Sequence, residues 1–163
     1  MMTEAEKRMH RCCFTGHRPE KLSGSEQHIK SALKKAIRQA IVDGFTVFVS
    51  GMARGIDLWA ALLVLELREE NSKVKLICAS PYEGFEKRWP EAWQTLYASV
   101  LEQADHVQFI GKGYSPDVFQ RRNEWMVNHS ARVIAVYNGT PGGTRNTIAY
   151  AKRIGIECEI IGL

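Results

Sequence analysis

Short apolar runs alternate with helical patterns along the chain, and this alternation restricts the fold more than any other feature. Runs typical of buried strands occupy residues 10–15, 45–49, 73–79, 106–110, 132–137 and 156–161. Between the first two, apolar residues recur every three or four positions from Ile29 to Ile41, which predicts one buried helix face. Strand, helix and strand in succession favour right-handed crossovers and a parallel sheet covered on both faces. The sequence therefore predicts a doubly wound α/β domain with about six strands.

Further helices are expected at residues 56–67, at 90–103, from about 115, and at about 144–154. Ser115 is expected to cap the third of these, with Pro116 in its first turn. The last helix is expected to stop at Gly155, because glycine is favoured just beyond helix C-termini. No linker, internal repeat or low-complexity tract divides the chain, so residues 1–163 are expected to form a single domain.

The segment IDLWAALLVLEL (56–67) is apolar on almost every side. A helix that covers one face of a sheet needs only one apolar stripe. The additional apolar surface must be buried by neighbouring helices or by a second subunit. We favour the second alternative and expect a homodimer.

Composition excludes several classes of protein. Apolar residues make up 45% of the chain and charged residues 25%, as in ordinary globular domains. The net charge is only +4 and no block of lysine and arginine occurs, so we do not expect a nucleic-acid partner. No run approaches about 18 consecutive apolar residues, so no membrane partner is expected. The charged N-terminus lacks the apolar core of a secretion signal, and we expect a cytoplasmic location.

The four cysteines, at positions 12, 13, 78 and 158, do not form a metal-binding motif. Adjacent Cys12 and Cys13 should point to opposite faces of a strand. We expect buried, reduced thiols that pack as small apolar side chains, and no metal site.

Ligands of open parallel sheets bind beyond the carboxyl ends of the strands, near the point where the strand order reverses. The loops that follow the first five strands read TGHRPEKL, SGMARGID, SPYEGFEKRW, GKGYSP and NGTPGGTRNT. The second and the fifth combine glycines with hydroxyl residues directly before a helix. This combination suits a phosphate, which binds exposed backbone N–H groups at a helix N-terminus where no side chain intervenes.

Within SGMARGID, Gly51 and Gly55 would let the backbone approach an anion. Ser50 could donate a hydrogen bond to it, and Arg54 could neutralise its charge. Asp57 is expected in the first helical turn, where it either complements the helix dipole or belongs to the site. Neither the GxGxxG nor the GxxxxGK[ST] pattern occurs, so we do not expect an ordinary dehydrogenase or P-loop NTPase.

Four segments together, CCFTGHRPEKL, SGMARGIDLWAA, RRNEWMVNHS and GGTRNTIAYA, resemble the YpsA-like branch of the SLOG superfamily. This superfamily groups DprA/Smf proteins with the LOG phosphoribohydrolases. The resemblance covers nearly the whole chain and implies a Rossmann-like fold with a pocket for a nucleotide-derived ligand, ADP-ribose-like or NAD-like. No other cofactor is expected. With Thr15 and Asp57 added from the same loops, the candidate binding residues are Thr15, Gly16, His17, Arg18, Ser50, Gly51, Arg54, Gly55, Asp57, Arg122, Asn123, Gly142, Gly143 and Thr144.

The chain departs from the LOG enzymes at one informative position. Their hydrolase motif resembles PGGxGTxxE, whereas PGGTRNTIAYA places Ile148 or Ala149 at the acidic position. Neither side chain transfers a proton or stabilises a developing positive charge. We therefore expect a binding or sensor protein with no catalytic residue. Two alternatives stay open: an N-glycosidic hydrolase that uses a different acid, and a DprA-like binder of single-stranded DNA, against which the low net charge argues.

Other polar and aromatic residues of these loops have competing interpretations. His17 could contact a phosphate or act as a base, or be a hydrogen-bonding surface group. Arg121 and Arg122 could serve the ligand or form a solvated basic face. Three rings, those of Tyr82, Trp89 and Tyr114, could stack on a base, whereas Trp59, Trp93 and Trp125 are expected in the core or an interface. The carboxylates available to an enzyme are those of Glu83, Glu86 and Glu124.

Overall fold

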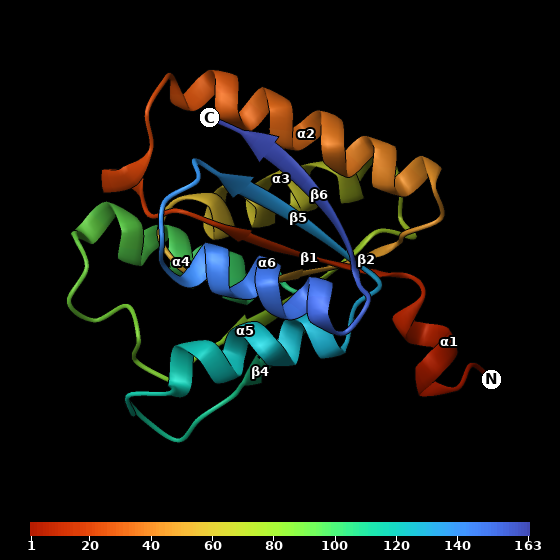
Figure 1. Ribbon diagram of the computed structural model, residues 1–163. Helices are drawn as coiled ribbons and strands as arrows, with labels where there is room; N and C mark the ends of the chain where they lie inside the picture. The colour runs from red at the N-terminus through yellow and green to blue at the C-terminus, as the bar shows by residue number, and fades with distance from the viewer.

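The computed structural model describes residues 1–163 (Figure 1). The strands are β1 (Arg11–Gly16), β2 (Val47–Ser50), β3 (Lys75–Ser80), β4 (His106–Phe109), β5 (Arg132–Tyr137) and β6 (Glu157–Gly162). They form one six-stranded sheet in the order β4-β3-β2-β1-β5-β6. Every neighbouring pair is parallel. The predicted doubly wound α/β fold is thereby confirmed.

The helices are α1 (Glu4–Arg8), α2 (Glu26–Val42), α3 (Ile56–Glu70), α4 (Glu91–Gln103), α5 (Val118–Asn128) and α6 (Gly143–Arg153), with a 3-10 turn at Pro19–Lys21. Of these, α1 was not predicted from the sequence. One face of the sheet is covered by α2, α3 and α4, and the other by α5 and α6 (Figure 1). Cys12 and Cys13 are fully buried in the two separate cores, which confirms that they face opposite sides. None of the helices has the length and apolar character needed to cross a membrane.

The strand order reverses between β1 and β5. From β1 the chain adds β2, β3 and β4 outward in one direction, and it then returns to place β5 on the other side of β1. In sheets of this kind the crevice at the carboxyl ends of the two strands flanking the reversal is the usual ligand position. The loops after β1, β2 and β5 meet there.

The apolar side chains on every side of α3 are buried by other parts of the same chain. Trp59 and Leu63 keep only 7% and 8% of their surface exposed. The helix is the middle one of three on its face, and it packs against α2, α4 and three strands. The expectation that a second subunit covers this helix is therefore wrong, because its neighbours already do. The homodimer itself stays a prediction.

Helix α5 begins later than expected. Its first residue is Val118, and its N-cap is Asp117 rather than Ser115. The Ser115 hydroxyl instead donates a hydrogen bond to the Asp117 carboxylate at 2.7 Å. The preceding loop instead turns back on β3, since the Gly111 N–H donates to the Pro81 carbonyl at 2.8 Å. At the end of α6, Gly155 lies beyond the C-cap with a φ of +82°, as expected.

Candidate functional site

His17 connects the loop after β1 to the loop after β5, the two strands between which the strand order reverses. Its Nε2 accepts the backbone N–H of Asn138 at 3.2 Å, and its side chain is only 5% exposed. Burial, helped by the charge of Lys21, lowers the pKa of His17. The ring is therefore neutral at pH 7, as an acceptor at Nε2 requires. His17 is a buried connection between β1 and β5, and its interpretation as a surface group was wrong.

The loop after β2 is held from inside by two side chains. The Ser50 hydroxyl is fully buried, donates to the Asp57 carbonyl at 2.8 Å and accepts the Met52 N–H at 3.2 Å. The Asp57 carboxylate lies in the first turn of α3, as predicted, and accepts the Ala53 N–H at 3.2 Å. Both groups thus support the loop, and the N-terminus of α3 already holds its own carboxylate.

The two glycines of this loop are required by the protein's own packing. A Cβ at Gly51 would lie 2.9 Å from Asp57 Oδ2 and 3.1 Å from Arg122 Nε. Gly55 has a φ of +90°, and a Cβ there would lie 2.8 Å from the His17 carbonyl oxygen. Arg54 pairs with Glu20 at 2.6 Å. An anion at Arg54 would therefore have to compete with a carboxylate.

Arg122 links α5 to the loop after β2. Its side chain is buried, its Nη1 donates to the Gly51 carbonyl, and its Nε donates to Asn123 Oδ1 at 2.8 Å. Burial lowers the pKa of this guanidinium, while the nearby Asp57 charge acts in the opposite direction. Of the two neighbouring arginines, only Arg121 lies on an exposed face. Arg122 belongs to the interior of the site.

The surroundings of Asp57 shift its acid–base equilibrium towards the neutral form. Burial raises its pKa from 3.8 to about 6, although the charge of Arg122 and the Ala53 N–H favour the ionised form. A carboxyl group with this pKa changes its protonation state in mildly acidic solution. It does so directly beneath the loop that contains Gly51.

We expect Asp57 to make the protein less stable as the pH rises from about 4 to about 6. In this window the folded protein binds more protons at Asp57 than the unfolded chain, so raising the pH favours unfolding. A shift of about two pKa units corresponds to roughly 2–3 kcal/mol. Urea titrations of the wild type and of Asp57→Asn, repeated across this range, isolate the effect from that of other carboxylates. The difference, Asp57→Asn minus wild type, should increase with pH, and a constant difference would contradict the assignment.

The N-terminus of α6 differs from that of α3. Its N-cap is Gly142, with a φ of +146°, no side-chain cap and no acidic residue in the first turn. Lys21 Nζ lies 3.6 Å from the position of a Cβ at Gly142. A Cβ at the exposed Gly143 would lie 3.8 Å from Asn123 Nδ2, while Thr144 is buried. Of the two predicted phosphate loops, NGTPGGTRNT is the one whose helix terminus is open to an anion.

The structure brings most of the predicted residues to one sheet edge but assigns them different tasks. Thr15 is buried at the end of β1, and Gly16 packs against Ile56. Arg18 is exposed. Burial and the positive charge of Arg18 both lower the pKa of Arg122. Lys21 and Asn138 were missed, although both lie in loops that the strand pattern had already marked.

At the two positions aligned with the LOG acid, Ile148 is buried in the second core and Ala149 is exposed. Packing against the sheet thus explains the apolar residue at position 148. No group of three or more His, Cys, Asp or Glu side chains is placed to hold a metal ion.

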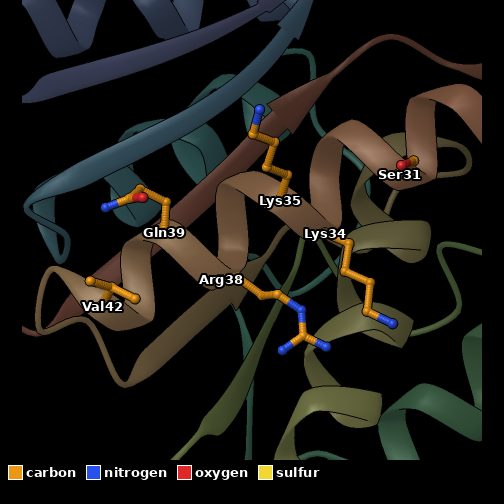
Figure 2. A pocket seen from close by; sticks show the side chains of 6 residues that line it. All are labelled: Ser31, Lys34, Lys35, Arg38, Gln39 and Val42. Atoms are coloured by element: carbon orange, nitrogen blue, oxygen red, sulfur yellow. The ribbon is translucent and has the colours of Figure 1, made fainter.

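A shallow hollow of about 390 Å³ lies elsewhere, on the outer side of α2 (Figure 2). Two of its lining cations are already paired with α3: Lys34 with Glu66 at 2.9 Å and Arg38 with Glu70 at 3.2 Å. Because α2 runs away from the carboxyl edge of the sheet, this hollow is separate from the crevice and adds nothing to it.

Comparison with known proteins yields one family. The model of the YspA SLOG family matches residues 12–155. UPF0398 proteins of Bacillus thuringiensis (strain Al Hakam) and Bacillus cereus (strain Q1) are 34% identical over 131 residues, covering 78% of this chain and 71% of theirs.

Among solved structures, DprA from Streptococcus pneumoniae is similar with a TM-score of 0.67 and 23% identity over 93% of this chain. DprA from Helicobacter pylori, studied for its single-stranded DNA binding, is similar with a TM-score of 0.65 and 16% identity over 96% of this chain. The chain spans 50% and 66% of these two proteins. At such identities the likeness shows the fold alone.

Proposed function

The chain belongs to the YspA SLOG family, and we propose that it binds a nucleotide or nucleotide-derived ligand, such as ADP-ribose or NAD, without hydrolysing it. The observation that carries the proposal is the N-terminus of α6. Glycine caps this helix, no carboxylate occupies its first turn, and Lys21 lies beside it. Backbone N–H groups, the helix dipole and a lysine together favour a phosphate.

The surroundings of this terminus support a phosphate ester in preference to a small free anion. On α5, Asn123 lies beside this terminus, and the neighbouring Arg122 contacts both Asn123 and the loop after β2. Arg18 adds an exposed positive charge. Together with Lys21, these groups support a ligand larger than a single phosphate.

A thermal-shift screen with AMP, ADP, ADP-ribose and NAD tests the proposal. A ligand present at about 100 times its dissociation constant should stabilise the protein by roughly 2.7 kcal/mol. The absence of a shift with every phosphate-bearing ligand would contradict it. Short single-stranded DNA belongs in the same screen, because tight binding that weakens steeply with salt would favour the DprA-like alternative.

We expect Gly143→Ala to fold normally and to lose ligand affinity. The new methyl group would be in ordinary contact with the protein, at 3.8 Å from Asn123 Nδ2, but it would occupy space in front of the helix terminus. Loss of one charge-assisted hydrogen bond, about 1.5–3 kcal/mol, would weaken binding roughly 10- to 100-fold. Calorimetry with the nucleotide found in the screen measures the change. The control is Gly113→Ala, where nothing lies within 4 Å of the added atom; equal affinities of the two variants would refute the phosphate position.

We expect no hydrolysis of nucleoside monophosphates, because an apolar residue stands where a LOG-type acid belongs. Chromatography after long incubation should find no free base or ribose phosphate above the protein-free background. Turnover that disappears when Glu83 or Glu124 is replaced would favour the hydrolase alternative. Turnover that survives replacement of both, and of Glu86, would show that the acid has been misidentified.

A further inference from the structure

Two hydrogen bonds from Asn138 connect the loop after β5 to the loop after β1. The Asn138 backbone N–H donates to His17 Nε2 at 3.2 Å, and Asn138 Nδ2 donates to the Lys21 carbonyl at 3.3 Å. No other hydrogen bond connects residues 138–142 to a segment that is distant in sequence. Packing adds little, because nothing lies within 4 Å of a Cβ built at Gly139. The position of this loop therefore depends on the two bonds of Asn138.

The same loop leads directly to the proposed phosphate position. Asn138 Oδ1 accepts the Thr140 N–H at 3.0 Å and the Thr140 hydroxyl at 2.6 Å, which stabilises the turn between β5 and α6. Two residues further on, Gly142 is the N-cap of α6. Lys21 Nζ lies 3.6 Å from a Cβ built at Gly142, while the Lys21 carbonyl accepts the hydrogen bond from Asn138. Asn138 thus holds the helix terminus and the lysine together.

The bond from Asn138 to His17 requires a neutral imidazole. A neutral ring has one acceptor nitrogen, which here is Nε2, whereas a protonated ring donates from both nitrogens. Protonation would place an N–H of the ring against the Asn138 N–H, and the loop would lose one of its two connections. The His17 side chain is only 5% exposed, so water has little access to replace the lost partner. The loop after β5 is therefore sensitive to the charge of His17.

The groups that surround His17 favour its neutral form at pH 7. Burial and the charge of Lys21 lower the pKa of the ring below its ordinary value of 6.5. Tyr137 of β5 lies against the ring, with centroids 5.8 Å apart. On the side of α3, the uncharged Gly55 approaches the His17 carbonyl. No carboxylate is among the groups that shift the pKa of the ring, so His17 becomes protonated only below pH 6.5.

We propose that His17 is a pH-dependent switch for the phosphate site: the neutral ring holds the loop after β5 in its binding position, and the protonated ring releases it. His17 acts through Asn138 and is a positioning residue. The protein should therefore bind its ligand at neutral pH and release it on acidification. The inference rests on the proposed function, since it assumes a phosphate at the N-terminus of α6.

Calorimetry with ADP-ribose between about pH 7.5 and pH 4.5 tests the switch. A phosphate monoester such as AMP takes up a second proton near pH 6, whereas the diphosphate bridge of ADP-ribose keeps its charge over this range. Below the pKa of His17, the fraction of protein with a neutral ring falls about tenfold per pH unit, and the measured affinity should fall with it.

The matched variant is His17→Gln, whose side-chain oxygen accepts a hydrogen bond at every pH. Its affinity profile should lack the part that is due to the ring. Asp57, with a pKa of about 6, also titrates in this range, but it is present in both proteins. The difference between the two profiles therefore reports the protonation of His17.

NMR spectroscopy of the wild type provides a second test that needs neither a ligand nor a substitution. The Asn138 amide resonance should shift with the same midpoint as the His17 ring, because its hydrogen bond breaks when the ring is protonated. The Gly142 amide should follow it. The control is the amide of Gly113, an exposed residue with nothing within 4 Å of a Cβ built there, which should not shift with this midpoint.

Identical pH profiles of wild type and His17→Gln would overturn the switch and leave the phosphate site intact. An affinity that rises on acidification in the wild type alone would also overturn it, because the charged ring would then contact the phosphate itself. An Asn138 amide that does not shift while the ring titrates would refute the switch without any ligand. If no phosphate-bearing compound binds at neutral pH, the proposed function fails, and its regulation by His17 fails with it.

Discussion

Replacing Gly16 by valine is expected to lower the free energy of unfolding by about 3 kcal/mol or more, at the upper end of the effects of overpacking. Gly16 ends β1, and a Cβ there would lie 2.4 Å from both Cβ and Cγ1 of Ile56. Ile56 is fully buried at the start of α3. Because α3 is covered on all sides, it has little freedom to move away. Urea denaturation followed by circular dichroism measures the loss, and complete unfolding would also agree with it.

Gly113→Val provides the matched control. Gly113 lies in an exposed loop, and nothing is within 4 Å of a Cβ built there. Its effect should stay within about 0.5 kcal/mol, as for most surface substitutions. A Gly16→Val protein with the wild-type midpoint would show that β1 and α3 separate easily. It would also make ligand binding the better explanation for this glycine, which the sequence had placed in the binding loop.

Arg122→Met is expected to reduce the free energy of unfolding by about 3–5 kcal/mol at pH 7, as when one partner of a buried charged pair is removed. The substitution deletes the donors to the Gly51 carbonyl and to Asn123 Oδ1. It also removes the positive charge that favours the ionised form of the buried Asp57. Ligand binding should be lost, because the loop after β2 loses its anchor on α5. Chemical denaturation and calorimetry on the same preparation measure the two effects.

A double-mutant cycle with Asp57 separates the charge from the packing. In the Arg122→Met background, Asp57→Asn should recover stability at pH 7, because it removes an uncompensated buried carboxylate. Arg122→Lys should fall between wild type and Arg122→Met, since it keeps the charge but not the planar fork. If the two single changes add within about 0.5 kcal/mol, the two side chains do not interact as the structure indicates.

Apart from α1 and the 3-10 turn, local patterns were sufficient to predict the order and type of the helices and strands. The strand predicted at 132–137 matches β5 residue for residue, and the other strands begin and end within two residues of their predicted positions. The opposite orientations of Cys12 and Cys13, and the end of α6 before Gly155, were also predicted correctly. These features depend on side-chain alternation and on backbone preferences of single residues, which act over a few positions. Nearby sequence is enough to determine them.

The loops that form the candidate site were predicted from the sequence, but the role of each residue in them was not. The glycine-rich loops after β2 and β5 show the same kind of pattern in the sequence, glycines and hydroxyl residues directly before a helix. Only the structure shows that Asp57 already occupies the N-terminus of α3, while the N-terminus of α6 has no such group. Arg54 pairs with Glu20, 34 residues away, so its apparent role as an anion ligand depends on a loop that is distant in sequence.

The sequence by itself thus determined the sheet, its helices and the edge at which a ligand would bind, because hydrophobic periodicity and strand direction are local properties. The tertiary structure alone decided which apolar and charged groups are buried. It covers α3 within one chain, and it places Arg122 against Gly51, 71 residues away. It also leaves Tyr114 exposed and one carboxylate oxygen of Glu86 buried without a hydrogen-bond partner. Burial and charge pairing depend on which elements become neighbours, and that information lies in the packing of distant segments.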